Sequence, residues 1–213
     1  MEKIAAYFSN YSSQYFQSVL EHLEISLLSV LIAILIAVPL GIISTHNKFL
    51  QKLTQRFFGM LRIIPSLTIL VIAIPLLGTG VKPAVLALAI LAIPPILVNT
   101  MIGFQTLPAS VLETAKGMGM SRRQTFFKVK FPLAFPVIFT GIRIAVVEVI
   151  ASATLAAYIG AGGLGGIIIT GLGLMKTEIL FIGGVSVAIL SLLCGEILNR
   201  IGNYITRYQR IGS

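Results

Sequence analysis

The chain has 213 residues, of which 56% are hydrophobic and only 11% are charged. A soluble domain carries roughly 25% charged residues, so this composition excludes an ordinary water-soluble fold and indicates an integral membrane protein. The formal net charge of +9 would suit nucleic-acid binding in a soluble protein. Basic residues between apolar runs instead indicate membrane orientation, and we expect no nucleic-acid partner.

The runs of apolar residues predict an all-α protein with five transmembrane helices, since each membrane helix needs about 20 apolar residues. The third run contains Pro94 and Pro95, which we expect to break or kink its helix because proline lacks the backbone N–H. A basic loop, 46–62, separates the first two runs. The five runs are 25–43, 63–77, one beginning near Ala84, 133–157 and 179–197.

The distribution of lysine and arginine predicts the orientation. Most of them lie in loop 46–62, in stretch 108–132 and in the tail 200–213, which share one side of a five-helix protein. Basic residues mark the cytoplasmic side, so we expect the N-terminus outside and the C-terminus inside. A sixth, short span over 158–174 would reverse the last helix. That segment is short and rich in glycine, which favours a re-entrant or surface-lying piece.

The most polar stretch, 108–132, must lie outside the bilayer. Residues 110–116 can form a short helix with Leu112 and Ala115 on one face. Gly117 and Gly119 then permit a sharp reversal. The stretch therefore begins as a helix that ends in a turn.

A second short helix is expected to start at Ser121, because Ser121 and Gln124 match a capping box. Its aromatic residues, Phe126 and Phe127, should pack against the membrane-side helices. Two short helices joined by glycines predict a compact element that protrudes from the membrane and presents itself to a partner.

This stretch resembles the coupling motif of inner-membrane permease subunits of ABC importers, which reads E-A-A, three residues, G, nine residues, I-x-L-P. Glu113, Ala115, Gly119 and Pro132 fall in register. The departures are Thr114 for alanine, Val129 for isoleucine and Phe131 for leucine. Segments 158–166 and 62–66 look most like the branch that imports glycine betaine, carnitine or choline.

The resemblance implies a type I transmembrane domain over about 19–199, after an extracytoplasmic segment 1–18 and before a basic cytoplasmic tail 200–213. It further implies a bacterial plasma membrane location, a second permease subunit, two cytoplasmic ATPases and an extracytoplasmic solute-binding protein. The chain would be no enzyme, since ATP and Mg²⁺ would bind the separate ATPase. The residues expected to couple to that ATPase are Glu113, Thr114, Ala115, Gly117, Gly119, Ser121 and Pro132.

Polar and helix-bending residues within the spans are candidates for the substrate path. Glu148 lies in mid-span, where a carboxylate is costly unless it faces a cavity or a partner. It would serve either as a counter-charge for a quaternary ammonium or as a structural group bonded to hydroxyls or backbone of adjacent helices. Arg143 lies five positions earlier and points elsewhere, toward the cytoplasmic interface. The candidates are Pro94, Pro95, Asn99, Glu148, Thr154, Tyr158, Gly162 and Gly163.

Several other chemistries lack support. The only cysteine is Cys194, in an apolar run, and neither His22 nor His46 has ligating neighbours at metal-site spacing, so we expect no metal and no cofactor in this chain. The glycines of 160–165 lack the strand and acidic residue of a dinucleotide site, and no Walker A pattern is present.

An autonomous secondary transporter or channel is the alternative function. It usually needs several intramembrane ionisable groups and an internal repeat. Glu148 and Arg143 are the only such groups, and the sequence shows no repeat. A purely structural membrane anchor would leave the protruding element unexplained.

Overall fold

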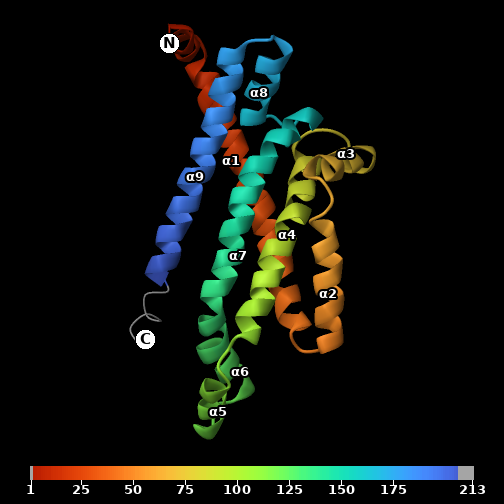
Figure 1. Cartoon of the computed structure of the whole chain (residues 1–213), viewed down its shortest axis with the longest axis vertical. Helices are drawn as coiled ribbons and strands as arrows, with labels where there is room; N and C mark the ends of the chain where they lie inside the picture. Colours follow the sequence, from red (N-terminus) through yellow and green to blue (C-terminus); the bar gives the residue numbers. More distant parts are fainter. Residues whose placement is uncertain (1, 206–213) are drawn as a thin grey trace.

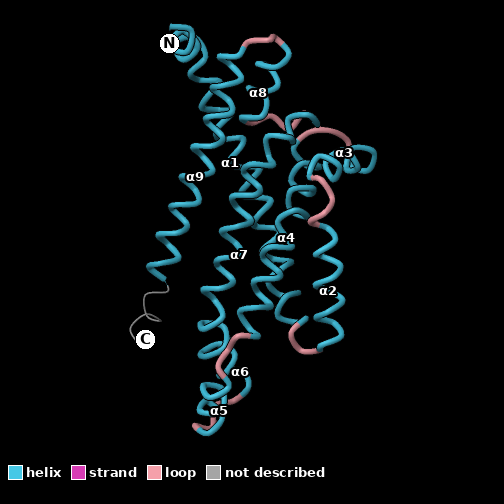
Figure 2. Tube along the Cα trace, viewed as in Figure 1, coloured by secondary structure: helices cyan, strands magenta, loops and turns pink. Residues whose placement is uncertain are grey.

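The computed structural model describes residues 2–205, and all the regular structure in this range is helical. The long helices lie side by side, and the short helices α5 and α6 extend beyond one end of the bundle (Figures 1 and 2). In chain order the elements are α1 (Glu2–Ser44), α2 (Lys48–Leu61), α3 (Ser66–Leu77), α4 (Val81–Gln105), α5 (Ala109–Gly117), α6 (Arg122–Thr125), the π-helix η1 (Phe126–Lys130), α7 (Phe131–Ser152), the 3₁₀ helix η2 (Ala153–Ile159), α8 (Leu164–Gly173) and α9 (Thr177–Ile205).

The described chain has four candidate spans, or five if a bent pair of helices is counted as one. Four are long apolar helices, and the fifth is the pair α2 and α3, which meet at an angle of 91°. Helix α8 has 10 residues, about 15 Å at 1.5 Å per residue, which is too short to cross a bilayer. It packs against α9 and α1 instead. The expected all-α fold is therefore confirmed, with four or five candidate spans.

Helix α2 corrects the expected basic loop at 46–62. The Asn47 side chain caps this helix by accepting a hydrogen bond from the backbone of Phe49. Lys48, Lys52 and Arg56 recur every four residues, which places them on one exposed face while other side chains pack toward α4 and α1. The charges in this stretch indicated a loop, but their spacing is that of an amphipathic helix.

Of the break or kink expected at Pro94 and Pro95, the break is wrong, because α4 is helical without interruption from Val81 to Gln105. Both prolines are buried, and α4 packs against α1, α3 and α7. The carbonyl of Pro95 accepts a hydrogen bond from the Asn99 side chain at 2.8 Å. Neighbouring helices that pack on several sides allow prolines inside a membrane helix.

The close approach of α4 and α7 depends on Gly141. A Cβ atom at this position would lie 2.6 Å from the Cβ of Asn99 and 2.7 Å from the carbonyl oxygen of Pro95. Neither neighbour is the flexible end of a long side chain. Small residues that bring backbones together are typical of helix contacts in membranes.

We expect Gly141→Ala to destabilise the protein by about 1–3 kcal/mol, because α4 and α7 must move apart to admit the methyl group. Thermal unfolding of the purified protein in detergent measures this. Gly184→Ala in α9 is the matched control, since its Cβ would meet nothing within 4 Å. Equal unfolding temperatures for the two variants would contradict the packing argument.

Candidate functional site

The protruding element consists of α5 and α6, with a turn between them that closes by hydrogen bonds. Gly119 has φ +73°, a left-handed conformation that favours glycine. Its backbone N–H donates to the carbonyl of Lys116 at 2.9 Å, and that of Met120 donates to Ala115 at 3.2 Å. This pair of bonds is a Schellman motif, which ends α5 and reverses the chain.

Helix α6 begins with the expected capping box. The Ser121 hydroxyl accepts a hydrogen bond from the backbone of Gln124 at 3.3 Å, and the Gln124 side chain accepts one from the backbone of Ser121 at 2.8 Å. Both bonds satisfy N–H groups that the first helical turn leaves unpaired. The predicted glycine turn and the predicted capping box are therefore both confirmed. The functional roles of these residues remain predictions.

One aromatic residue ties the protruding element to the bundle. The ring of Phe126 stacks on that of Phe104 at the end of α4, with centroids 5.8 Å apart and an interplanar angle of 13°. Phe126 therefore packs against the membrane-side helices as expected. Phe127 was expected to do the same, but its side chain is 60% exposed, so that expectation is wrong. Since α6, η1, α7 and η2 form one helical stretch, Arg122–Ile159, a displacement of α6 can reach the middle of the bundle.

The outer face of the protruding element is free in this chain. Glu113 and Thr114 are exposed, and Met118 at the tip is 75% exposed. Ala115, on the opposite face of α5, is buried. The element therefore presents a carboxylate and a narrow glycine turn to any partner that docks on it.

A second group of functional candidates lies in mid-span, where Glu148 forms an ion pair with Arg62. The Arg62 Nη2 atom donates to Glu148 Oε1 at 3.1 Å, with the two side chains 53% and 37% exposed. Arg62 follows α2 at the 91° bend, so the pair joins this bend to α7. The partner of Glu148 is thus an arginine, which corrects the expected bonding to hydroxyls or backbone.

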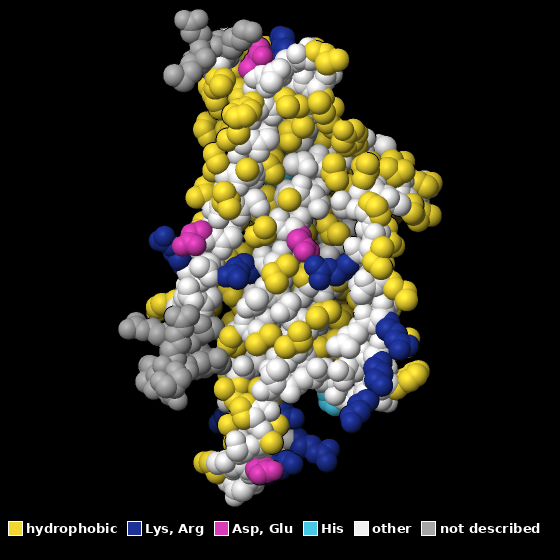
Figure 3. Space-filling model, in the orientation of Figure 1, with side chains coloured by type: hydrophobic (Ala, Val, Ile, Leu, Met, Phe, Trp, Pro, Cys, Tyr) yellow, Lys and Arg dark blue, Asp and Glu magenta, His cyan; other side chains and the backbone are white. Residues whose placement is uncertain are grey.

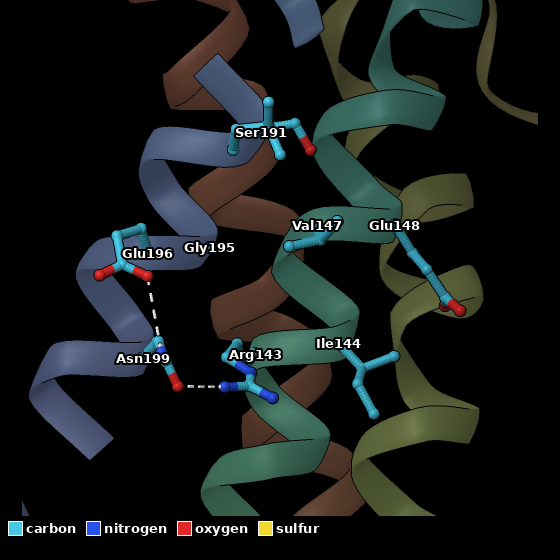
Figure 4. A pocket seen from close by; sticks show the side chains of 9 residues that line it. Arg143, Ile144, Val147, Glu148, Ser191, Gly195, Glu196 and Asn199 are labelled. Atoms are coloured by element: carbon cyan, nitrogen blue, oxygen red, sulfur yellow. Dashed lines mark hydrogen bonds between the residues drawn. The ribbon is translucent and has the colours of Figure 1, made fainter. Parts of the chain in front are cut away.

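Arg143 points to the other side of α7, as Figure 4 shows, and its Nη1 atom donates to Asn199 Oδ1 of α9 at 2.6 Å. This bond ties α7 to α9. The expected reach of Arg143 toward the cytoplasmic interface remains a prediction. Asn199 also bonds Glu196, which pairs with Arg200 at 2.9 Å. Arg143, Glu196 and Asn199 border a cavity of about 600 Å³ between α7 and α9.

Charged side chains therefore cross the middle of one face of the bundle (Figure 3). Charged groups within membrane spans almost always face a partner or a water-filled cavity. This face, which carries the Arg62–Glu148 pair and the Arg143–Asn199 bond, is accordingly the candidate surface for a transport path or a second subunit.

The glycine-rich segment after η2 is fixed to α1. The backbone N–H of Gly163 donates to Glu21 Oε2 at 3.0 Å, and a Cβ at Gly162 would lie 2.7 Å from the same oxygen. Both glycines have positive φ, +81° for Gly162 and +72° for Gly163. Close packing explains these glycines, and Glu21 is a partner that the sequence did not reveal.

The predicted path residues fall into three separate groups. Pro94, Pro95 and Asn99 lie between α4 and α7, where Asn99 is half-buried and the prolines are buried. Glu148 lies on the charged face. Thr154, Tyr158, Gly162 and Gly163 lie beyond it, at the end of the bundle opposite α5 and α6. The role of each residue in a path remains a prediction.

Arg62, Asn199 and Glu196 were missing from the predicted site residues. Arg62 directly precedes the apolar run 63–77, and a mid-span carboxylate such as Glu148 needs a partner. Those two sequence features together could have identified the Arg62–Glu148 ion pair. No sequence feature pointed to Asn199 or Glu196 in the same way.

Known proteins resemble this chain over most of its length. Residues 37–210 match the family described as binding-protein-dependent transport system inner membrane component. The carnitine transport permease protein OpuCB of Listeria monocytogenes is 39% identical over 201 residues, covering 94% of this chain and 92% of the relative. The glycine betaine/carnitine/choline transport system permease protein OpuCB of Bacillus subtilis is 42% identical over 178 residues, covering 84% and 82%.

The fold matches solved structures as well. A chain of the MetNI methionine ABC transporter in an inward-facing conformation superposes with a TM-score of 0.81 at 24% identity, covering 90% of this chain and 96% of that chain. A chain of an amino acid ABC transporter gives a TM-score of 0.76 at 16% identity, covering 92% and 96%. The sequence matches and the shared fold establish that the chain belongs to the family of inner membrane components of binding-protein-dependent transport systems.

Proposed function

We propose that this chain is the membrane-spanning permease subunit of an ATP-driven importer for a small quaternary amine such as glycine betaine, carnitine or choline. The observation that carries the proposal is the protruding element, whose Schellman turn at Gly119 and exposed Glu113 fall in register with the coupling motif. The substrate class rests on the relatives, since transport systems named for carnitine, choline and glycine betaine recur among them.

In this proposal two ATPases dock on the α5–α6 elements of two permease subunits. ATP-driven closure of the ATPases moves α6, and the continuous stretch Arg122–Ile159 transmits this movement to the charged mid-span face. The path then opens alternately to each side. The basic ends of the helices face the cytoplasm of a bacterial cell, and a solute-binding protein delivers the substrate outside.

The aligned mid-span charges favour a path at the interface with a second subunit over a path within one chain. In the described chain, Glu148 and Arg143 already have partners, so neither is a free ionisable site of the kind that drives a secondary transporter. ATP hydrolysis therefore supplies the free energy in the proposed mechanism.

Reconstitution tests the proposal directly. We expect vesicles that contain this chain, its ATPase and its binding protein to accumulate radiolabelled glycine betaine, carnitine or choline only when ATP reaches the ATPase. Vesicles without the ATPase are the control and should accumulate none. Uptake by the chain alone under an ion gradient would establish the secondary transporter instead. ATP-dependent uptake of another solute, with no quaternary amine transported, would refute only the substrate class.

A further inference from the structure

A cavity of about 390 Å³ lies between the end of α1 and the protruding element. Its lining includes three basic side chains, Lys116, Arg122 and Lys130, and the imidazole of His46. Among the described residues, no carboxylate contributes to this lining. We call this cavity the basic cavity.

A second cavity of about 240 Å³ adjoins the basic cavity. The two share His46, Leu112, Phe126 and Lys130. The second cavity continues between the ends of α1 and α4, where apolar side chains such as Ile42 and Phe104 line it together with polar ones. Basic groups with apolar side chains beside them suit an amphipathic ligand with an anionic head.

The position of the basic cavity agrees with such a ligand. Helices α1 and α4 end at Ser44 and Gln105, so this region lies where the apolar spans give way to polar chain. Phospholipid headgroups occupy that level of a membrane. Several cations around one cavity repel one another unless an anion joins them, and basic pockets beside membrane helices bind phosphate headgroups.

We propose that the basic cavity binds a phosphate group supplied by the headgroup of an anionic phospholipid, with Lys116, Arg122 and Lys130 as its cationic partners. The start of the acyl chains would lie along the second cavity, against Ile42 and Phe104. Because Lys116 and Arg122 belong to α5 and α6, a bound headgroup would contact the same short helices that carry the proposed coupling motif.

The residues that line the basic cavity differ from Glu113, the exposed residue proposed to contact the ATPase. Glu113 is exposed and does not line the basic cavity, whereas Leu112 and Lys116, four positions apart on one face of α5, do. An acidic surface of the ATPase could instead occupy the basic cavity, and lipid retention with and without the ATPase distinguishes the two.

The test uses the assembled transporter in vesicles of phosphatidylcholine and phosphatidylglycerol in known proportion. After extraction into detergent, mass spectrometry measures the phosphatidylglycerol retained by each complex. We expect the wild type to retain more than the bulk proportion. We expect the variant with Arg122→Gln and Lys130→Gln to retain it with about 30-fold lower affinity, since each basic residue near an anionic lipid contributes about fivefold.

The variant with Arg123→Gln and Lys128→Gln is the matched control, because it removes the same charge from neighbouring positions outside the basic cavity. It should retain phosphatidylglycerol as the wild type does.

Equal losses in both double variants, or no enrichment in the wild type, would refute the site. Complete displacement by inorganic phosphate would refute the lipid source in favour of soluble phosphate. Enrichment that appears only when the ATPase is absent would assign the cavity to the ATPase.

Discussion

Gly119→Val is expected to reduce ATP-dependent uptake by about tenfold or more while the protein still assembles. Gly119 has φ +73°, and a β-branched residue held in this region costs about 1–3 kcal/mol. The turn would relieve that strain by changing its backbone, which breaks the bonds to Lys116 and Ala115 that orient α6 relative to α5. Uptake and ATP hydrolysis measured on the same reconstituted vesicles would show hydrolysis without proportionate transport.

Gly119→Asn is the matched control, because asparagine is of similar size but tolerates the left-handed conformation. A Cβ atom at position 119 meets no neighbour within 4 Å in this chain, so the two variants differ mainly in backbone strain. We expect Gly119→Asn to retain most of the uptake. If both variants lost uptake equally, close approach of the ATPase would explain the glycine and the backbone argument would be wrong.

The protruding element could be predicted from the sequence because its structure is decided locally. The capping box of Ser121 and Gln124 and the glycine turn each depend on residues within five positions. Such patterns remain visible without any knowledge of tertiary contacts. For the same reason, the helix predicted at 110–116 agrees with the observed α5 to within one residue at each end.

The errors arose where tertiary packing decides the structure. The proline pair was expected to break or kink α4, but α1, α3 and α7 pack against this helix and no break occurs. The charges of 46–62 concealed the amphipathic period of α2. The Arg62–Glu148 pair joins residues 86 positions apart, and no local pattern specifies such a contact.

Loss of the Arg62–Glu148 ion pair is expected to impair transport strongly. We expect Glu148→Gln to lower uptake by about tenfold, because it leaves Arg62 unpaired in mid-span. An unpaired arginine at the centre of a membrane helix costs about 2.5–3.5 kcal/mol, and the partial exposure of both side chains reduces this cost. Arg62 would move toward water, which releases the bend between α2 and α3 from α7. Uptake in reconstituted vesicles, with the amount of assembled complex measured alongside, tests this.

Exchanging the two charges distinguishes an ion pair from two separate roles. The variant with Arg62→Glu and Glu148→Arg restores opposite charges across the contact, so it should transport better than either single substitution. Arg200→Gln is the matched control, since it breaks an exposed pair with Glu196 within α9 and such surface pairs contribute little to stability. If the exchanged variant were no better than the single ones while Arg200→Gln remained active, Glu148 would act on the transported solute or on a second subunit, and its contact with Arg62 would be incidental to transport.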